Sequence, residues 1–342
     1  MKIDNKASER IKATGFLCAL LVVTIHSATL ADDMPRAVRI LQNIGTNTVS
    51  RLAVPWFFVI SGFFLANKAF EENTSLSIWY RMSLHKRLMS LAIPYFLWNV
   101  IYYVFKILTG KYGFDVWHCF AQITGLDYGG YSPACGQFWY VRCLFVYILL
   151  SPVFVAAIWR KWVGFTALAV LAVLWLFGAS PLVRHIQPFN WSYMLFFGSG
   201  LWIARHGVDD FWHNGVLKTV LAVVFVISSV FVVFDMAWGR MAERSMILSG
   251  LPLMWFCSKW IVQMMNPMRG LWSLAFFVYA AHVIFISVTN TVLLKVMSVG
   301  PVYHFVGYLG KIFCSIAACL ALGWLMRKYA AKLLALLSGG RS

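Results

Sequence analysis

Apolar residues occur in long runs along the whole chain, separated by short polar breaks. Most runs are about twenty residues long, which is the length that an α-helix needs to cross the hydrocarbon core of a bilayer. The pattern therefore predicts about ten spanning helices. Their ranges are Ala13 to Ala31, Thr48 to Phe70, Met89 to Gly110, Gln137 to Ile158, Trp162 to Ala179, Trp191 to Arg205, Val216 to Trp238, Met246 to Met265, Leu271 to Met297 and His304 to Met326.

The composition agrees with this pattern. Of the 342 residues, 61% are hydrophobic and 12% are charged, and the mean hydropathy is +0.74. A soluble domain carries roughly 25% charged residues, so lipid is the expected solvent. Backbone groups in lipid must be satisfied within the protein, which leaves helices or closed barrels, and barrel strands would alternate over about ten residues. We predict an all-α, polytopic helix bundle formed by one membrane domain over residues 1–342, without internal repeats.

The net charge of +17 invites a nucleic-acid interpretation, but the distribution of the basic residues opposes it. With a cytoplasmic N-terminus, most of the basic loop residues fall in inside segments. The outside loops keep fewer: Arg36, Arg39, Lys111, Arg184, Arg240, Arg244 and Lys295. This asymmetry follows the positive-inside rule and predicts ten spans with both termini in the cytoplasm. The basic residues then serve topology and contact with lipid headgroups, and no nucleic acid is expected as a partner.

The seven cysteines show no paired CxxC spacing, so we expect no metal or redox cluster. Cys119 and Cys135 share the longest outside loop, from Gly110 to Gly136. A disulfide between them and two free thiols are both compatible with an oxidising outside compartment. The loop is rich in Tyr, Trp and Gly, which suits either stacking on a sugar ring or an aromatic membrane belt. On the inside, Glu71 to Leu88 is predicted to form an interfacial amphipathic helix.

Ionisable residues inside a span are costly, so each needs a reason. His26 lies about twelve residues into the first span, roughly 18 Å along a helix, in the outer half of the bilayer. A neutral imidazole can take a proton from a hydroxyl at neutral pH, which makes His26 a candidate general base. A histidine that only bonds neighbouring helices is the alternative. The same alternative applies to His282 in the ninth span. Tyr279, one turn away, is a candidate partner for it, and a structural hydrogen bond between helices is the more ordinary use of such a histidine.

Basic and aromatic residues mark both faces of the predicted bundle. Arg51 and Arg142 open the second and fourth spans on the outer side, and Trp139 and Tyr140 precede Arg142. These four are candidates for acceptor contact, although each arginine suits equally well a side chain that reaches to the membrane surface.

Arg81, Lys86 and Arg87 precede the third span on the inner side. Their charges suit a phosphorylated ligand, and attraction to anionic lipid explains them equally well.

Several segments together point to a known family. The first span reads GFLCALLVVTIHSA, the second RLAVPWFFVISGFFLA, and the third begins HKRLMSLAIPYFLWN. Later segments read QFWYVRCLFVYILLSP, FFGSGLWIAR and SLAFFVYAAHVIFI. In this order they resemble the integral-membrane acyltransferase-three family of O-acyltransferases, whose opening helix carries a functional histidine that His26 matches. The family typically has an arginine separated from this histidine by ten residues, and here Gly15 stands in its place. Lys12 and Arg10 are the nearest basic residues.

The resemblance implies a bacterial inner-membrane O-acetyltransferase. It implies that an acetyl group passes from cytoplasmic acetyl-CoA, a substrate and not a bound cofactor, to a hydroxyl of a cell-surface glycan. Such a glycan is lipopolysaccharide O-antigen or a glycan linked to undecaprenyl. His26 would act as general base or carry the acyl group, and Ser61 is a candidate donor to the oxyanion. Arg10, Lys12, Arg81, Lys86 and Arg87 are the candidate donor-binding residues. A transporter or flippase for a lipid-linked sugar and a non-catalytic membrane scaffold remain alternatives, although transporters often show internal repeats.

Overall fold

The computed structural model is all-helical over the residues that it describes, which are 5–29, 31, 34–71, 76–125, 133–178, 191–207 and 214–340. Six stretches of this part are long and apolar enough to span a membrane, and a bent helix pair is a seventh candidate. One of the six, Gly239–Val296, contains two long helices. The chain is therefore an all-α, multi-pass membrane protein. The count of ten spans and the side on which each terminus lies stay predictions.

The chain divides into two compact units, and each is described by itself. The first contains Phe58–Gly207 and Leu325–Ser342, and the second contains Ile3–Phe57 and Val208–Trp324. The helices of the second unit are α1 (Asn5–Ser27), α2 (Arg36–Asn47), η1 (Val49–Leu52), α11 (Gly215–Val233), α12 (Gly239–Met265), η4 (Asn266–Leu274), α13 (Ala275–Val296), a π-helical turn η5 (Tyr303–Gly307) and most of α14 (Tyr308–Tyr329).

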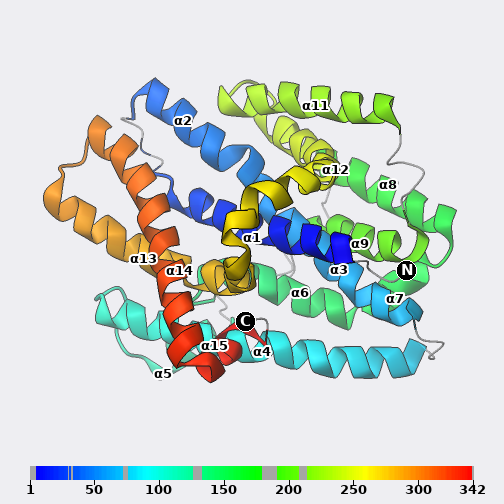
Figure 1. Ribbon diagram of the computed structural model, residues 1–342, viewed down its shortest axis with the longest axis horizontal. Coiled ribbons are helices and arrows are strands. Elements are labelled where there is room, and N and C mark those ends of the chain that lie inside the picture. Colours follow the sequence, from blue (N-terminus) through cyan, green and yellow to red (C-terminus); the bar gives the residue numbers. More distant parts are fainter. Residues whose placement is uncertain are drawn as a thin grey trace. The chain divides into compact units, whose positions relative to one another are not determined.

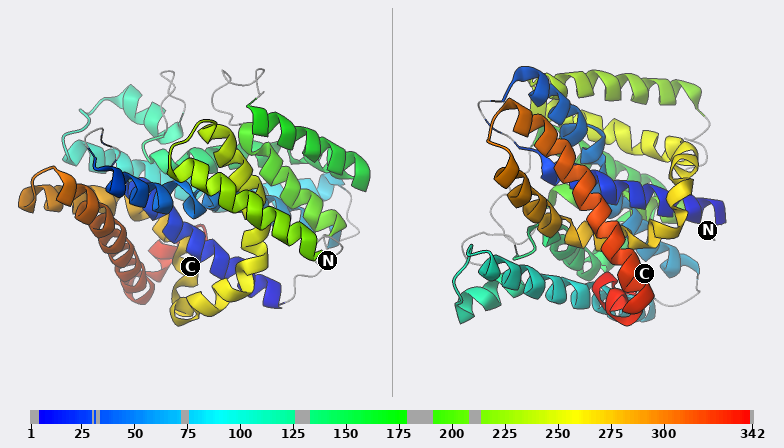
Figure 2. Two further views of the ribbon diagram at one scale, coloured as in Figure 1. Left: turned by 90° about the horizontal axis from the view of Figure 1, so that it is seen from above. Right: turned by 60° about the vertical axis from the view of Figure 1, so that its left-hand side comes forward.

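In the second unit, α1 is the central helix. It packs along α12 and α13, and α2, η1 and η4 also contact it. The α11 and α12 helices form an antiparallel hairpin, which is plain in Figures 1 and 2. The α11 helix exposes an apolar surface that includes Val216, Val220, Val223, Val226 and Ile227. An exposed apolar patch of this length is rare on soluble proteins, which is consistent with lipid covering α11.

Among the described residues, the first unit is built from most of α3 and from nine further helices. They are α3 (Ala53–Glu71), α4 (Leu76–Leu108), α5 (Val116–Thr124), η2 (Gly136–Phe138), α6 (Trp139–Leu149), α7 (Ser151–Ile158), α8 (Lys161–Phe177), η3 (Trp191–Tyr193), α9 (Met194–His206) and α15 (Ala331–Ser338). The α4 helix contacts α5, α6 and α15, while α8 and α9 pair with each other and with α7.

A close helix crossing in the first unit explains the glycines of two family segments. A Cβ atom at Gly62 of α3 would meet the carbonyl oxygen of Phe197, and one at Gly200 of α9 would meet the carbonyl oxygen of Val59. The two backbones touch because neither glycine has a side chain. Small residues at such contacts are how helices approach closely in membranes.

The predicted helix boundaries differ from the structure in three places. The fourth predicted span is two helices, α6 and α7, bent by 64°, and Pro152 in the first turn of α7 fits the break. The expected interfacial helix from Glu71 to Leu88 is not separate, because from Leu76 onward it is the first part of α4. The short helices α2, α5 and α15 were not expected, since hydropathy detects only long apolar runs.

Candidate active site

His26 and His282 lie side by side in the second unit. Their ring centroids are 5.0 Å apart and the rings are tilted by 49°. His26 is exposed, whereas His282 is fully buried. The α1 helix ends at Ser27, one residue after His26, while α13 continues from His282 to Val296. The accessible imidazole therefore stands at the end of α1 against the interior of α13.

His282 is bonded to its own helix. Its Nδ1 lies 2.8 Å from the carbonyl oxygen of Tyr279, and its ring lies 6.3 Å from the Tyr279 ring. Tyr279 therefore contacts His282 through its backbone carbonyl, within one turn of the same helix, and a role for the Tyr279 side chain stays a prediction. The Tyr279 ring also packs edge-on against Phe57 at 6.1 Å.

Buried polar contacts hold the chain that follows His26. The Thr29 N–H donates to Oε1 of Gln42 at 2.9 Å, and Nε2 of Gln42 donates to the hydroxyl oxygen of Thr29 at 3.0 Å. The same Nε2 donates to the carbonyl oxygen of His304 at 2.9 Å. Gln42 is buried and Thr29 is half-buried, so these bonds are at least partly shielded from water and tie the chain after α1 to α2 and η5.

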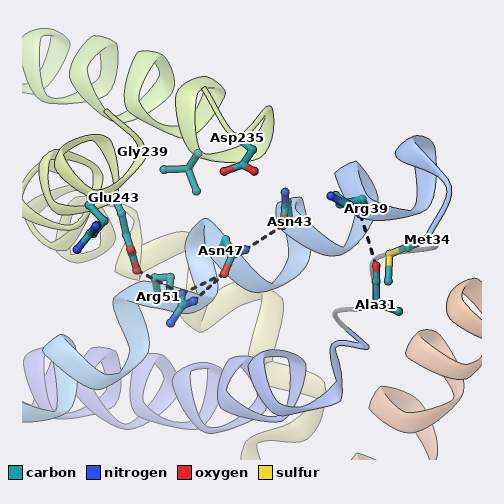
Figure 3. Close-up of a pocket in the computed structure, with 11 residues that line it drawn as sticks. Ala31, Met34, Arg39, Asn43, Asn47, Arg51, Asp235, Gly239 and Glu243 are labelled. Carbon is teal, nitrogen blue, oxygen red and sulfur yellow. Dashed lines mark hydrogen bonds and ion pairs between the residues drawn. The ribbon is translucent and has the colours of Figure 1, made fainter. Parts of the chain in front are cut away.

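A polar pocket of about 380 Å³ opens in the second unit between α2, η1 and the α11–α12 turn (Figure 3). Arg51 donates to Oδ1 of Asn47 through Nη2 at 2.8 Å, and Asn47 donates to Oδ1 of Asn43 at 2.9 Å. Glu243 lies 3.4 Å from Nε of Arg51. The remaining charged side chains at the pocket are Arg39, Asp235 and Arg240.

Arg51 lies at the pocket and also influences His26 electrostatically. The guanidinium of Arg51 lines the pocket and its positive charge acts on the His26 ring. Sequence reasoning placed Arg51 on the acceptor side. Asn43, Asn47 and Glu243 were not predicted, because two asparagines at helical spacing form no recognisable motif and Glu243 lies far from them in the chain.

The candidate donor-binding residues on α1 face different surroundings. Arg10 is engaged by α12: its Nε donates to the hydroxyl of Ser258 at 2.5 Å, its Nη2 donates to the Trp255 carbonyl at 2.8 Å, and its guanidinium lies 4.1 Å from the centre of the Trp255 ring. Lys12 is exposed. Apart from the adjacent backbone of α1, no atom of the described residues lies within 4 Å of where a Cβ would stand on Gly15.

Gly15 and His26 share a face of α1, because eleven residues make three helical turns, about 17 Å along the axis. Lys12 lies one turn before Gly15 near the same face. Ala19 and Val22, which lie between Gly15 and His26 on this face, are buried. The two ends of the face are therefore open and its middle is packed.

The inner cluster before the third predicted span is described only in part. The side chains of Arg81 and Lys86 lie outside the described residues, although their backbones belong to α4. Arg87 is half-buried and has interactions within the protein. The donor-binding role of these three residues stays a prediction.

In the first unit, Ser61 and Tyr140 bond to each other. Their hydroxyl oxygens are 3.0 Å apart. Phe58 packs on the Tyr140 ring at 4.6 Å and on the Trp139 ring at 6.4 Å, and Tyr193 packs on Trp139 at 5.2 Å. Tyr140 is buried. The expected acceptor-side aromatics Trp139 and Tyr140 therefore take part in an aromatic cluster inside the first unit.

Arg142 caps a helix. Its Nη1 donates to the carbonyl oxygen of Gly125 at 2.9 Å. Gly125 ends α5 in the left-handed conformation, with a φ of 74°, and its carbonyl is therefore available to a cation. This contact gives Arg142 a structural task that the sequence did not indicate.

Lys311 is a charged residue that the sequence interpretation overlooked. It lies in α14 with only 4% of its surface exposed, and no ion pair involves it among the described residues. A single lysine in an apolar run was the available signal.

Cys119 and Cys135 are free thiols, so the disulfide alternative does not hold in this structure. The described residues also contain no group of three or more His, Cys, Asp or Glu side chains able to hold a metal ion.

Comparison with protein families identifies the family of the chain. The model of the acyltransferase-three family, described as an acyltransferase domain, matches residues 16–328, which is most of the chain. The matched range contains His26, Ser61, the Gly62–Gly200 crossing and His282, and it begins one residue after Gly15. A search of curated proteins and a search of solved structures found no match. Since the family model covers both compact units, the chain belongs to the acyltransferase-three family and is a membrane acyltransferase.

Proposed function

We propose that the protein is an O-acetyltransferase of the bacterial inner membrane. It takes the acetyl group of cytoplasmic acetyl-CoA and transfers it to a hydroxyl of an extracytoplasmic or lipid-linked cell-surface glycan. His26 is the proposed general base or acyl carrier. The observation that carries the proposal is the accessible His26 ring, placed within the electrostatic reach of an arginine that also lines a polar pocket.

The lining of the pocket suits a sugar. Arg39, Arg51 and Arg240 supply donors, Asp235 and Glu243 supply acceptors, and the amide of Asn43 or Asn47 supplies both. A polyhydroxylated ring presents alternating donors and acceptors and is matched by such a mixture. The proposed acceptor therefore binds in this pocket with one hydroxyl directed past Arg51 toward His26.

The proposed chemistry needs one group that can both take and give a proton. In the first route, His26 removes the proton from the glycan hydroxyl while the hydroxyl oxygen attacks the thioester carbonyl carbon. The C–S bond then breaks, and the CoA thiolate takes the proton from the His26 imidazolium. In the second route, a His26 nitrogen attacks the thioester carbonyl carbon, the C–S bond breaks and the CoA thiolate leaves. The glycan hydroxyl then attacks the acetyl carbonyl carbon, the bond to the His26 nitrogen breaks, and the CoA thiolate takes the hydroxyl proton. Both routes require an imidazole that is accessible from outside its own helix.

The open end of the α1 face at Lys12 and Gly15 supports a donor site there. Lys12 and the space beside Gly15 occupy the end of this face that the positive-inside distribution predicts to be cytoplasmic. Lys12 is the proposed replacement for the family arginine in contacting a CoA phosphate. Arg10, whose guanidinium is held by Trp255 and Ser258, is the weaker candidate.

A flippase for a lipid-linked sugar is the second candidate function, because the polar pocket would suit its cargo equally well. Such a protein would move the glycan without acetylating it. The family match favours acyl transfer, since it covers residues 16–328 as an acyltransferase domain.

The test is acetyl transfer by purified protein in lipid vesicles, with His26→Gln compared with the wild type. Glutamine keeps the size and polarity of the side chain but cannot take a proton. Positioned proton transfer is worth about 10²- to 10⁴-fold, so we expect a loss of that size with unchanged membrane insertion. His85→Gln, at an exposed histidine of α4, is the matched control and should keep activity. Near wild-type activity in His26→Gln would remove His26 from the mechanism.

A further inference from the structure

One ring nitrogen of His282, Nδ1, is hydrogen-bonded, and the other, Nε2, has no hydrogen-bond partner among the described residues. The groups bonded to Nδ1 are carbonyl oxygens of its own helix, those of Tyr279 and Val278. A carbonyl oxygen only accepts hydrogen bonds, so Nδ1 carries the proton. In a neutral imidazole with a proton on Nδ1, Nε2 is a bare acceptor.

This Nε2 atom is buried and has no hydrogen-bond partner among the described residues. A buried acceptor without a partner costs about 1–3 kcal/mol, so a helix-packing role alone is a poor explanation for a histidine at this position. Phenylalanine or leucine would fill the same volume without that cost. The unpaired Nε2 therefore indicates a partner that is not bonded in this arrangement of the side chains.

His26 is the group beside it. Because Nδ1 is bonded to the α13 backbone, Nε2 lies at the end of the ring that points away from α13, and α1 is among the helices packed against α13. The ring centroids are 5.0 Å apart and no hydrogen bond joins the two rings among those of the described residues. The 49° tilt excludes face-to-face stacking. A rotation of the exposed His26 side chain is the movement needed to bring one of its N–H groups to Nε2.

We propose that His282 is a positioning residue for His26. Its Nε2 accepts a hydrogen bond from one ring N–H of His26, which fixes the tautomer and the orientation of that ring. The other His26 nitrogen is then the one presented, without its proton, to the acceptor hydroxyl. This inference rests on the proposed function for its catalytic meaning, but the hydrogen bond itself can be tested without it.

A neutral partner suits this location. An Asp or Glu would hold the His26 ring in the same way, but it would bring a full charge into a buried site within a membrane span. His282 provides an acceptor without that charge. When His26 takes the proton of the acceptor hydroxyl, the same bond stabilises the imidazolium, as the residue behind a catalytic histidine does in hydrolases.

Two substitutions separate positioning from packing. His282→Gln places an amide oxygen near the former Nε2, where it can still accept from His26, but it gives up the Nδ1 bond to Tyr279. His282→Asn places its amide near the former Nδ1, keeps the bond to the Tyr279 carbonyl, and falls short of His26. The two variants thus exchange the two contacts of the histidine.

The experiment measures kcat and KM for acetyl transfer together with the ¹⁵N chemical shifts of the histidine ring nitrogens, with His26 assigned by its loss in His26→Gln. We expect His282→Asn to lower kcat by about 10- to 100-fold with little change in the KM for acetyl-CoA, and His282→Gln to recover most of this loss. The His26 nitrogens should show one dominant tautomer in the wild type and in His282→Gln, and a mixture in His282→Asn.

The proposal is overturned if the His26 tautomer is the same in all three proteins, or if both variants lose kcat equally while the tautomer stays fixed. Should the wild type transfer no acetyl group at all, the proposed function fails while the ¹⁵N shifts still decide whether His282 orients His26. If one variant does not insert stably, the other can still be compared with the wild type, because each variant keeps one of the two His282 contacts, to His26 or to Tyr279, and loses the other.

Discussion

Two segments that resemble the family, the end of α1 and the middle of α3, serve different purposes in the structure. The α1 segment presents an accessible His26 beside a buried His282 with an unpaired nitrogen. The α3 segment places Gly62 against the backbone of α9 and bonds the Ser61 hydroxyl to Tyr140. The α3 match is the more specific of the two in sequence. A specific motif can therefore report a packing constraint, while the residue proposed for the chemistry is a single polar side chain in an apolar run.

We expect the largest effect, a loss of stability, from a substitution at the close crossing of α3 and α9. In Gly200→Val, the new side chain would collide with the carbonyl of Val59, which cannot move without shifting α3. Overpacking typically costs about 1–3 kcal/mol, and a backbone collision lies at or above that range. We expect a lower melting temperature and loss of monodisperse protein on fluorescence-detected size exclusion.

Gly15→Ala is the matched control, because open space surrounds Gly15 and alanine favours a helix by up to about 1 kcal/mol over glycine. It should fold at least as well as the wild type. A Gly200→Val protein as stable as Gly15→Ala would contradict the close crossing.

The next effect concerns donor binding at the other end of α1. Lys12→Ala should raise the KM for acetyl-CoA about tenfold, the size expected for losing one charge-assisted phosphate contact, and leave the KM for the acceptor unchanged. Adding Gly15→Arg to that variant should restore the affinity, since the space beside Gly15 is free to receive the side chain. Lys6→Ala is the control, because Lys6 lies on the opposite face of α1 from Gly15. An unchanged KM in Lys12→Ala would exclude Lys12 as a donor-binding residue and leave Arg81, Lys86 and Arg87 as the candidates.

A smaller effect is expected at Ser61. Ser61→Ala and Tyr140→Phe remove the same hydrogen bond, so each should lower stability by about 1 kcal/mol, and the double variant should cost little more than either single one. Measured kcat should fall less than tenfold. If Ser61 instead donates to the oxyanion as the family resemblance implies, Ser61→Ala alone would lower kcat by about 10²- to 10³-fold.

The smallest effect separates the two cysteines that share a loop. Cys135 is fully buried, and this burial raises the pKa of its thiol well above the ordinary value, whereas Cys119 is half-buried. A maleimide reacts with the thiolate. In detergent we expect labelling of Cys119 at neutral pH and none of Cys135, even as the pH rises through the ordinary thiol pKa, because the folded Cys135 stays protonated there. If neither cysteine is labelled until a reductant is added, Cys119 and Cys135 form a disulfide.

The sequence predicted the helical membrane fold because apolar runs of spanning length are a local signal. It could not predict the break between α6 and α7 in advance, since a proline inside a spanning helix bends it in one protein and is tolerated in another. Pro94 lies within the continuous α4.

The candidate site was predictable only in part. His26 and His282 each stand out as polar residues in apolar runs, but their approach to 5.0 Å depends on how α1 and α13 pack, which no single-sequence pattern encodes. The Asn43–Asn47–Arg51 hydrogen-bond chain has helical spacing, yet its pairing with Glu243 joins residues far apart in sequence. The hydrogen bond from Arg142 to the carbonyl of Gly125 at the end of α5 could not be predicted, because α5 itself was not predicted.

In the proposed mechanism, the acetyl group crosses from a cytoplasmic donor to an extracytoplasmic acceptor by way of His26. Sealed inside-out vesicles, with glycan enclosed in the lumen, are given labelled acetyl-CoA on their exposed cytoplasmic face, and the glycan of the lumen is then isolated. The account predicts label on the enclosed glycan with the wild type and none with His26→Gln. Label that appears only on glycan supplied at the same face as the donor would contradict transfer across the membrane.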